Sequence, residues 1–208
     1  MNLEIPEPLP RKFYDRDTVT VAKALLGQKL VRVDHGTGMV IAGIIVETEA
    51  YLGVIDKAAH TYNHHKTERV RTMWGEPGHA YVYFTYGMHH CVNVTTHGHG
   101  RPEAVLIRAL EPTDGVEVMW DRREKAKKER DLCSGPAKLT KALGITLDLD
   151  GVDVTCPDSQ LYVAGMRKRA YSGDLIASSE RIGVGYAEEW AKKLFRFHLK
   201  QNLHVSKG

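Results

Sequence analysis

The amino-acid sequence predicts one α+β domain built around an antiparallel sheet. Segments rich in Val, Ile, Tyr and Thr recur along the chain, a short turn suited to a hairpin joins two of them, and helical segments are interspersed among them. The chain has 208 residues, of which 42% are hydrophobic and 26% are charged. These values are ordinary for one globular domain and exclude a disordered or fibrous protein.

The first half of the chain predicts an arm, a helix, five strands and a long loop. Residues 1–14 are rich in proline and charge and are expected to form an irregular N-terminal arm. Asp17 and Thr18 can cap a helix that ends at Gly27. Residues 53–79 have no clear period and predict a long loop, which in a small domain often carries function. Strands are expected at residues 29–33, 39–52, 81–86, 91–95 and 104–110, with a hairpin turn at residues 35–38.

The second half of the chain predicts shorter elements. Thr113 and Asp114 are expected to cap a helix through Trp120, and the charges of alternating sign at residues 121–131 are typical of a solvated face or loop. A further helix begins at residues 134–136 and ends at Gly144. Short strands are expected at residues 152–155, 161–164 and 195–199, and a helical piece at residues 187–193. No repeat or linker divides the chain, so we expect one domain over residues 1–208.

Cysteine content and charge indicate the compartment and the partners. The sequence has three cysteines, an odd number, at the widely spaced positions Cys91, Cys133 and Cys156. This pattern predicts that the protein has no disulfide framework and functions in a reducing compartment. No apolar run is long enough to cross a bilayer and no secretory signal begins the chain, so we expect a cytoplasmic or nucleoid protein without a membrane partner. The net charge is +3, and residues 160–208 hold nine Lys or Arg against four Asp or Glu, which is compatible with binding nucleic acid.

Two acids at the end of an apolar strand form the least ordinary segment. Period-two geometry places Glu47, Glu49 and Tyr51 on one face of the strand. Either the strand leaves the core there and the acids are solvated, or one acid is a general base beside an aromatic ring. Three tyrosines at residues 81–86 leave a similar choice, because they can pack as ordinary strand residues or stack on a planar nucleobase.

The eleven histidines raise the question of a metal site. Pairs such as His64 and His65 or His89 and His90 point to opposite faces of a strand, and the sequence has neither HExxH nor CxxC spacing. We therefore expect no metal and no cofactor. His60 is a lone histidine in the long loop, and the glycines at residues 183–185 are interpreted as a turn.

The chain resembles the alkyladenine, or 3-methyladenine, DNA glycosylase family over nearly its whole length. The clearest segment is Ile45-Val46-Glu47-Thr48-Glu49-Ala50-Tyr51-Leu52-Gly53. Further matching segments, in the family's order and spacing, are residues 13–15, 24–28, 56, 58–60, 81–83, 86–88, 93, 105–112, 132–136, 181–185 and 189–191. The resemblance implies a single mixed domain with a curved antiparallel sheet and surrounding helices.

The resemblance also implies roles for individual residues. Glu49 is the general base that activates a water molecule, and Arg108 helps to hold that water. The implied base pocket consists of Tyr51, His60, Tyr83 and Asn93, the last disfavouring normal guanine. Tyr86 enters the duplex to fill the vacated space, and Met73 packs near that intercalation site.

These roles imply a monofunctional glycosylase of base-excision repair. It would flip alkylated or deaminated purines (3-methyladenine, 7-methylguanine, hypoxanthine or ethenoadenine) out of duplex DNA and hydrolyse the N-glycosidic bond. The implied partner is double-stranded DNA containing a damaged purine, contacted through its phosphates near Arg69 and Arg71, and the implied state is a monomer.

The sequence differs from the family pattern in one loop, and two other classes of function remain as alternatives. The chain has Thr67-Glu68-Arg69-Val70 and Trp74 where family members tend to read Thr-Pro-Arg-Asn and Phe, in a loop that borders the pocket. The alternatives are a lesion-binding module without catalysis, which would share the aromatic pocket, and a histidine-rich metallohydrolase.

Overall fold

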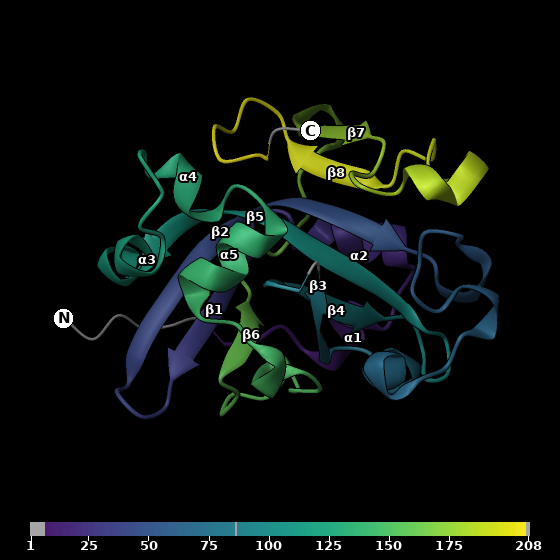
Figure 1. Ribbon diagram of the computed structural model, residues 1–208, viewed down its shortest axis with the longest axis horizontal. Coiled ribbons are helices and arrows are strands. Elements are labelled where there is room, and N and C mark those ends of the chain that lie inside the picture. The colour runs from purple at the N-terminus through teal and green to yellow at the C-terminus, as the bar shows by residue number, and fades with distance from the viewer. Residues whose placement is uncertain (1–6, 86, 207–208) are drawn as a thin grey trace.

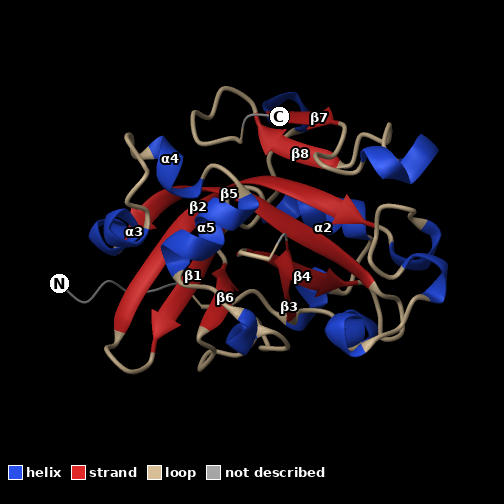
Figure 2. Cartoon of the chain, viewed as in Figure 1, coloured by secondary structure: helices blue, strands red, loops and turns tan. Residues whose placement is uncertain are grey.

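An eight-stranded antiparallel sheet, curled and covered by helices, organises the chain (Figures 1 and 2). The computed structural model describes residues 7–85 and 87–206. The strands are β1 Lys29–Asp34, β2 Met39–Tyr51, β3 Ala80–Thr85, β4 His89–Thr96, β5 Glu103–Asp114, β6 Leu161–Ala164, β7 Ile176–Ser179 and β8 Arg196–Leu199. The order is β3-β4-β5-β2-β1-β6, and β8 pairs with both β2 and β7.

Short helices surround this sheet. The α-helices are α1 Arg11–Tyr14, α2 Thr18–Leu25, α3 Val116–Arg122, α4 Arg130–Cys133 and α5 Pro136–Leu143. The 3-10 helices are η1 Gly53–Ile55, η2 Tyr62–His64, η3 Glu68–Trp74, η4 Leu147–Leu149, η5 Gly173–Leu175 and η6 Gly185–Trp190. No helix among the described residues is long and apolar enough to cross a membrane.

Strand β2 is the centre of the sheet and changes its partner along its length. Its first half pairs with β1, from Met39 to Ile44, whereas Glu47, Thr48 and Glu49 pair with β8. The opposite edge of β2 pairs with β5, and the register shifts on both sides of Glu47. Such irregularities bend a strand and increase its twist, so the sheet curls at the point where β2 leaves β1 for β8.

The two faces of the sheet have different neighbours. Thr48 donates a hydrogen bond from Oγ1 to the carbonyl oxygen of Ala22 in α2 (2.9 Å), and Ile107 lies opposite Thr48 in the register. That face therefore packs against α2 and forms the main apolar core. The neighbouring positions, such as Glu49, Asn93 and Leu106, face the other way. In Figure 1, α2 lies behind β2 and β5, whereas α5 lies in front of them.

Most sequence-predicted elements are confirmed. Helix α2 begins where the Asp17 carboxylate accepts a hydrogen bond from the amide of Thr20 (2.8 Å), and α5 ends at Gly144 in a left-handed conformation. The predicted strands at residues 29–33, 39–52, 81–86, 91–95, 104–110, 161–164 and 195–199 correspond to β1 to β6 and β8, with residue 86 outside the described residues. The α+β class and the curved antiparallel sheet are likewise confirmed.

Three local expectations are wrong, and one strand was missed. The N-terminal arm is not irregular at its end, because Arg11–Tyr14 forms a helical turn that buries Tyr14. Asp114 does not cap α3; it belongs to β5 and pairs with Lys29 (2.9 Å), while Gly115, with φ of 63°, begins the helix. Residues 152–155 form a turn in which Asp153 makes one isolated bridge to His79, and β7 was not predicted.

Candidate active site

A cavity of about 290 Å³ opens on the face of the sheet that points away from α2. Its walls come from β2 to β5 and from loops far apart in the sequence. The lining residues are Tyr51, Ala58, His60, Met73, Tyr81, Tyr83, Thr85, Cys91, Asn93, Ala104, Leu106, Arg108, Pro136, Ile182, Gly183, Val184 and Tyr186. The cavity thus brings together the four residues predicted for a base pocket, Tyr51, His60, Tyr83 and Asn93, and it is also lined by Arg108, which was predicted to be catalytic.

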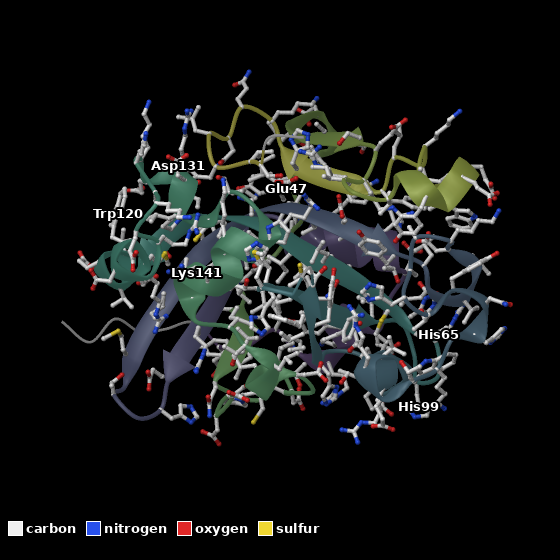
Figure 3. All side chains as sticks on the ribbon, in the orientation of Figure 1. Glu47, His65, His99, Trp120, Asp131 and Lys141 are labelled. Carbon is white, nitrogen blue, oxygen red and sulfur yellow. The ribbon has the colours of Figure 1, made fainter. Side chains whose placement is uncertain are left out.

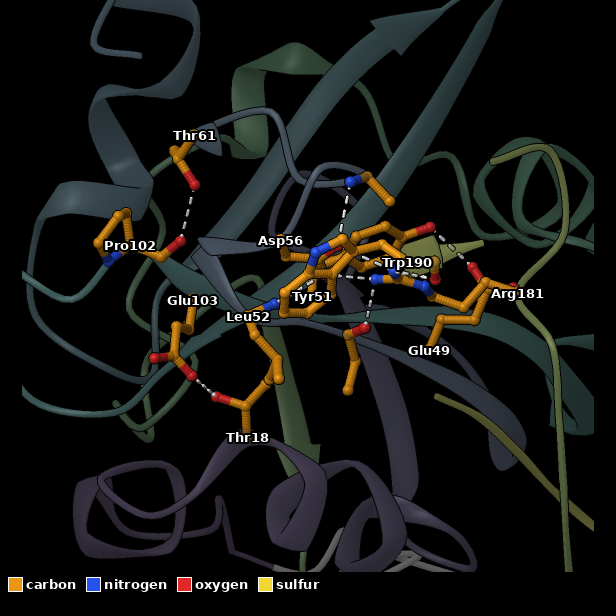
Figure 4. Close-up of polar contacts among 12 residues, drawn as sticks. Thr18, Glu49, Tyr51, Leu52, Asp56, Thr61, Pro102, Glu103, Arg181 and Trp190 are labelled. Carbon is orange, nitrogen blue, oxygen red and sulfur yellow. Dashed lines mark hydrogen bonds and ion pairs between the residues drawn. The ribbon is translucent and has the colours of Figure 1, made fainter. Parts of the chain in front are cut away.

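Glu49 is fully buried directly behind this wall. Its Oε2 accepts a hydrogen bond from the Tyr51 hydroxyl (2.8 Å), as Figure 4 shows, and its Oε1 accepts one from the amide of Ile182 (2.8 Å). The Arg108 guanidinium lies 3.1 Å from the same Oε1 atom. The interpretation of Glu47 and Glu49 as solvated acids is therefore wrong, because neither side chain is exposed.

Arg108 joins the two acids of β2. Its Nε donates a hydrogen bond to Glu47 Oε1 (3.1 Å), and its Nη1 lies 3.1 Å from Glu49 Oε1. Glu47 also accepts hydrogen bonds from Arg196 Nε (2.6 Å) and from the amide of Ser206 (2.7 Å). Buried charges are tolerated when they are paired and hydrogen-bonded, so Glu47 anchors Arg108 while Glu49 remains the acid nearest to the cavity.

A second buried ion pair supports Tyr51. Asp56 and Arg181 form two hydrogen bonds, of 2.5 and 2.9 Å, and neither side chain is exposed (Figure 4). The Arg181 guanidinium lies 4.7 Å from the centre of the Tyr51 ring. Because Ile182 follows Arg181 directly, the same pair fixes both the ring and the amide that contact Glu49.

Aromatic rings form one wall of the cavity. Tyr81 and Tyr83 are stacked with centroids 5.4 Å apart, and His60 meets Tyr83 edge-on at 4.6 Å. The Tyr81 hydroxyl and His60 Nδ1 are 2.8 Å apart. Burial lowers the pKa of His60 to about 4 and raises the pKa of Tyr51 and Tyr83 well above the usual range. These rings are therefore neutral at pH 7 and offer flat, uncharged faces.

The floor and the rim hold three of the other predicted residues. Asn93 is buried between β3 and β5 and donates a hydrogen bond from Nδ2 to the carbonyl oxygen of Tyr81 (3.1 Å). Met73 is also buried, packed with Val70 and Tyr81 at the cavity wall. Arg69 is exposed at the rim, with its guanidinium 5.5 Å from the centre of the Tyr83 ring.

Of the other two residues predicted to contact DNA, one does not line the cavity and the other lies outside the described residues. Arg71 is exposed, and its one ion pair within the described part of the chain is with Glu68, at 3.9 Å. Tyr86, the expected intercalating residue, lies outside the described residues. Trp74, one of the departures from the family pattern, packs beside Met73 and lies under the Lys66 ammonium (5.3 Å).

The histidines do not gather into a metal site within residues 7–85 and 87–206, where no three His, Cys, Asp or Glu side chains are placed to share an ion. Figure 3 shows His65 and His99 at one end of the molecule and Trp120 and Asp131 at the other. The described part of the chain therefore gives the metallohydrolase alternative no support.

Several lining residues were missed by reasoning from the sequence. Residues 183–185 were interpreted as a turn, yet Gly183 and Val184 line the cavity with Ile182. Cys91 lines it too. Cys91 could have been predicted to line the site, because it is two positions from Asn93 on one strand and so lies on the same face. No local sequence pattern indicated the loop of Ile182, whose amide contacts Glu49, 133 residues away in the sequence.

Comparisons with known proteins identify the family of the chain. The model of the methylpurine-DNA glycosylase family matches residues 12–203. A Bacillus cereus (strain AH820) protein named "Putative 3-methyladenine DNA glycosylase" is 45% identical over 203 residues, covering 95% of this chain and 98% of that protein. A Bacillus anthracis (strain A0248) protein of the same name has the same identity and coverage. The chain therefore belongs to the methylpurine-DNA glycosylase family, a family of DNA repair enzymes that hydrolyse N-glycosidic bonds.

Proposed function

We propose that this protein is a monofunctional DNA glycosylase that binds a flipped, damaged purine in the cavity and releases it by hydrolysis. The substrate class is alkylated or deaminated purines, namely 3-methyladenine, 7-methylguanine, hypoxanthine and ethenoadenine. The partner is double-stranded DNA that contains such a base, and the protein acts as a monomer. The curated relatives carry names that refer to the first of these bases.

The observation that carries the proposal is the meeting of Glu49, Arg108 and Tyr51 at one corner of the cavity. Glu49 is hydrogen-bonded to Tyr51 and paired with Arg108, and both of these partners line the cavity. A carboxylate can accept about four hydrogen bonds, and Oε2 accepts only that of Tyr51 among the described contacts. A water molecule that enters between Tyr51 and Arg108 would therefore find an acceptor for its proton.

The cavity suits one damaged base in size and in chemistry. Its volume of about 290 Å³ is at the lower end of ligand sites, which begin near ~300 Å³. Stacking on aromatic rings contributes about 1–3 kcal/mol per base, which offsets the cost of flipping, a few kcal/mol. Alkylation at N3 or N7 makes a purine cationic, and a neutral tyrosine face attracts a cation by a further ~0.5–2 kcal/mol.

Hydrolysis then needs only one base and one water. As the N-glycosidic bond lengthens, positive charge builds on the sugar, and the Glu49 carboxylate stabilises that charge while it takes a proton from the attacking water. In this proposal, Arg108 holds the water through a guanidinium N–H, while Glu47 fixes the orientation of Arg108. A purine alkylated at N3 or N7 is cationic and leaves as a neutral base, so no general acid is required for this part of the substrate class.

The position of Lys57 supports hydrolysis without strand cleavage. A lyase step would need an amine at the cavity to form a Schiff base with the sugar. Lys57 instead pairs with Glu188 (2.6 Å) and Glu189 (3.3 Å), and no lysine is among the described lining residues. Asn93, held by its hydrogen bond to Tyr81, is proposed to exclude the 2-amino group of normal guanine.

The test is the substitution Glu49→Gln, with Glu111→Gln as the matched control. Glu111 is on β5, accepts a hydrogen bond from Asn202 and does not line the cavity. General-base catalysis contributes about 10²–10⁴-fold, so Glu49→Gln should lose that factor in single-turnover base release from duplexes carrying one damaged purine each. The variant should still bind the duplex, and the control should keep the wild-type rate.

Two outcomes would contradict the proposal. If Glu49→Gln releases bases at the wild-type rate, Glu49 is not the base. If the wild-type protein binds each damaged duplex but hot alkali reveals no abasic site, the alternative of a lesion-binding module without catalysis is correct.

A further inference from the structure

A second groove, of about 730 Å³, lies on the outer side of α2. Five of its lining residues are cations, and no described carboxylate lines it. The lining residues are Leu9, Phe13, Arg16, Thr20, Lys23, Ala24, Gln28, Gly165, Met166, Arg167, Lys168, Arg169, Ala170, Tyr171, Gly173 and Ile176. We call this feature the basic groove, and the segment of residues 165–171 its strap.

The cations of the basic groove are not neutralised by the protein itself. Arg16, Lys23, Arg167, Lys168 and Arg169 have no ion pair with a carboxylate among the described residues. Arg16 is half-buried and the other four cations are exposed to solvent. An uncompensated cluster of this size attracts a polyanion.

The strap is held in place by specific contacts rather than lying loosely on the surface. The buried Gln28 accepts hydrogen bonds at Oε1 from the amides of Met166 (2.8 Å) and Arg167 (3.2 Å), and donates from Nε2 to the Arg167 carbonyl oxygen (3.1 Å). The Arg167 guanidinium stacks on the Tyr171 ring at 3.8 Å.

Gly27 makes room for this stack. A Cβ atom at Gly27, where φ is +81°, would lie 2.5 Å from the Tyr171 ring and 2.8 Å from the Arg167 side chain. The groove therefore presents one cation, Arg167, held against an aromatic ring, with Lys168 and Arg169 next to it in the strap, and clustered cations of this kind are typical of nucleic-acid-binding surfaces.

The basic groove and the lesion cavity are on opposite sides of the sheet. Thr48 contacts the inner side of α2 through the Ala22 carbonyl oxygen, whereas the exposed Lys23 is on the side that lines the groove. Glu49, the next residue after Thr48, points to the cavity side through Tyr51 and Arg108. A duplex that presents its damaged base to the cavity thus has the sheet and α2 between itself and the groove.

We propose that the basic groove binds the phosphate backbone of a second duplex while the cavity face holds the first. This inference rests on the proposed function, because it assumes that the cavity face holds DNA. The attraction comes from counterion release at phosphates and is independent of base sequence. The enzyme would in this way hold two DNA segments at once. It could transfer from one segment to the other while it stays bound to at least one of them.

The test is a bridging assay. A short duplex with one damaged purine is immobilised, the wild-type protein is bound to it, and capture of a labelled, undamaged duplex is measured while base release is followed in the same samples. The triple variant R167Q/K168Q/R169Q should capture at least tenfold less of the second duplex and release the base at the wild-type rate. The matched control K125Q/K127Q/K128Q removes three exposed lysines between α3 and α4 and should capture normally.

Two further measurements test whether the cations of the groove contact phosphates: the salt dependence of capture, and a variant on the other wall of the groove. Each phosphate contact adds about 0.9 to the slope of log affinity against log salt, so the triple variant should lower the slope of the second binding event by about 2.7. Lys23→Gln, on α2, should weaken capture in the same direction, and normal base release reports that each variant is folded.

The outcomes separate this inference from the proposed function. Base release without capture of a second duplex overturns the second site and leaves the glycosylase intact. Capture that survives in the triple variant also overturns it, because two protein copies joined to each other would then be the bridge. Absence of base release in the wild-type protein instead overturns the proposed function.

Discussion

The two ion pairs Arg181–Asp56 and Arg11–Asp153 allow the role of burial to be measured within one protein. Both have a closest nitrogen–oxygen distance of 2.5 Å. The side chains of the first pair are 0% exposed, whereas those of the second are 37% and 34% exposed. We predict that Arg181→Gln is far more destabilising than Arg11→Gln, although each substitution removes one guanidinium from one carboxylate.

The expected magnitudes follow from the environment of each carboxylate. Removing one partner of a buried pair leaves an uncompensated charge and costs about 3–5 kcal/mol. The half-buried pair is screened by solvent, and we expect its contribution to be near the ~0–1 kcal/mol of surface pairs. With a urea dependence of ~2 kcal/mol per M, Arg181→Gln should lower the unfolding midpoint by roughly 1.5–2.5 M and Arg11→Gln by less than about 0.5 M.

The same experiment has a functional readout. Arg181 supports the Tyr51 ring and precedes Ile182, and both of these residues contact Glu49. Base release per folded molecule should therefore fall in Arg181→Gln and stay unchanged in Arg11→Gln. Equal shifts of the two unfolding midpoints, or full activity in folded Arg181→Gln, would refute the reasoning.

Three further predictions concern the cavity and its DNA. Burial lowers the pKa of His60 from 6.5 to about 4. Between pH 6.5 and pH 4, His60 is therefore protonated in the unfolded chain but not in the folded protein. The free energy of unfolding should consequently decrease as the pH falls from about 6.5 to 4. His60→Gln should remove that part of the acid sensitivity of the urea midpoint, and an unchanged pH profile would contradict it. Tyr83→Ala should weaken binding of a damaged duplex by about 5- to 150-fold through the loss of ~1–3 kcal/mol of stacking, while Tyr83→Phe should bind nearly as the wild type. Duplex affinity should fall steeply with rising salt, and a flat titration would exclude phosphate contacts as the main source of affinity.

Local chemistry was enough to predict most of the fold. The Asp17 cap, the Gly144 stop and the strand-forming residue types of β4 and β5 are properties of short segments, and the elements predicted from them are confirmed. The failures depend on distant partners. Asp114 has a good capping side chain, but Lys29, 85 residues earlier, holds it in β5.

The site was predictable to a different degree. Strand alternation placed Glu49 and Tyr51 on one face but left open whether the acids are solvated, because their burial depends on Arg108 and on the amide of Ile182, distant in sequence. The resemblance selected Glu49 and Arg108, yet no role was assigned to Asp56 or Arg181, whose importance is visible only from their contacts.

The partners of Glu47 have a consequence for how the enzyme matures during its synthesis. Arg108, Arg196 and Ser206 follow Glu47 by 61, 149 and 159 residues, and all three bond to its carboxylate. A nascent chain folds from its N-terminus as it leaves the ribosome, so β2 is made long before its carboxylates can be neutralised. The hydrogen-bond network of Glu47 is complete only when β8 and Ser206 have emerged, so the corner that we propose to be catalytic is among the last parts of the fold to form.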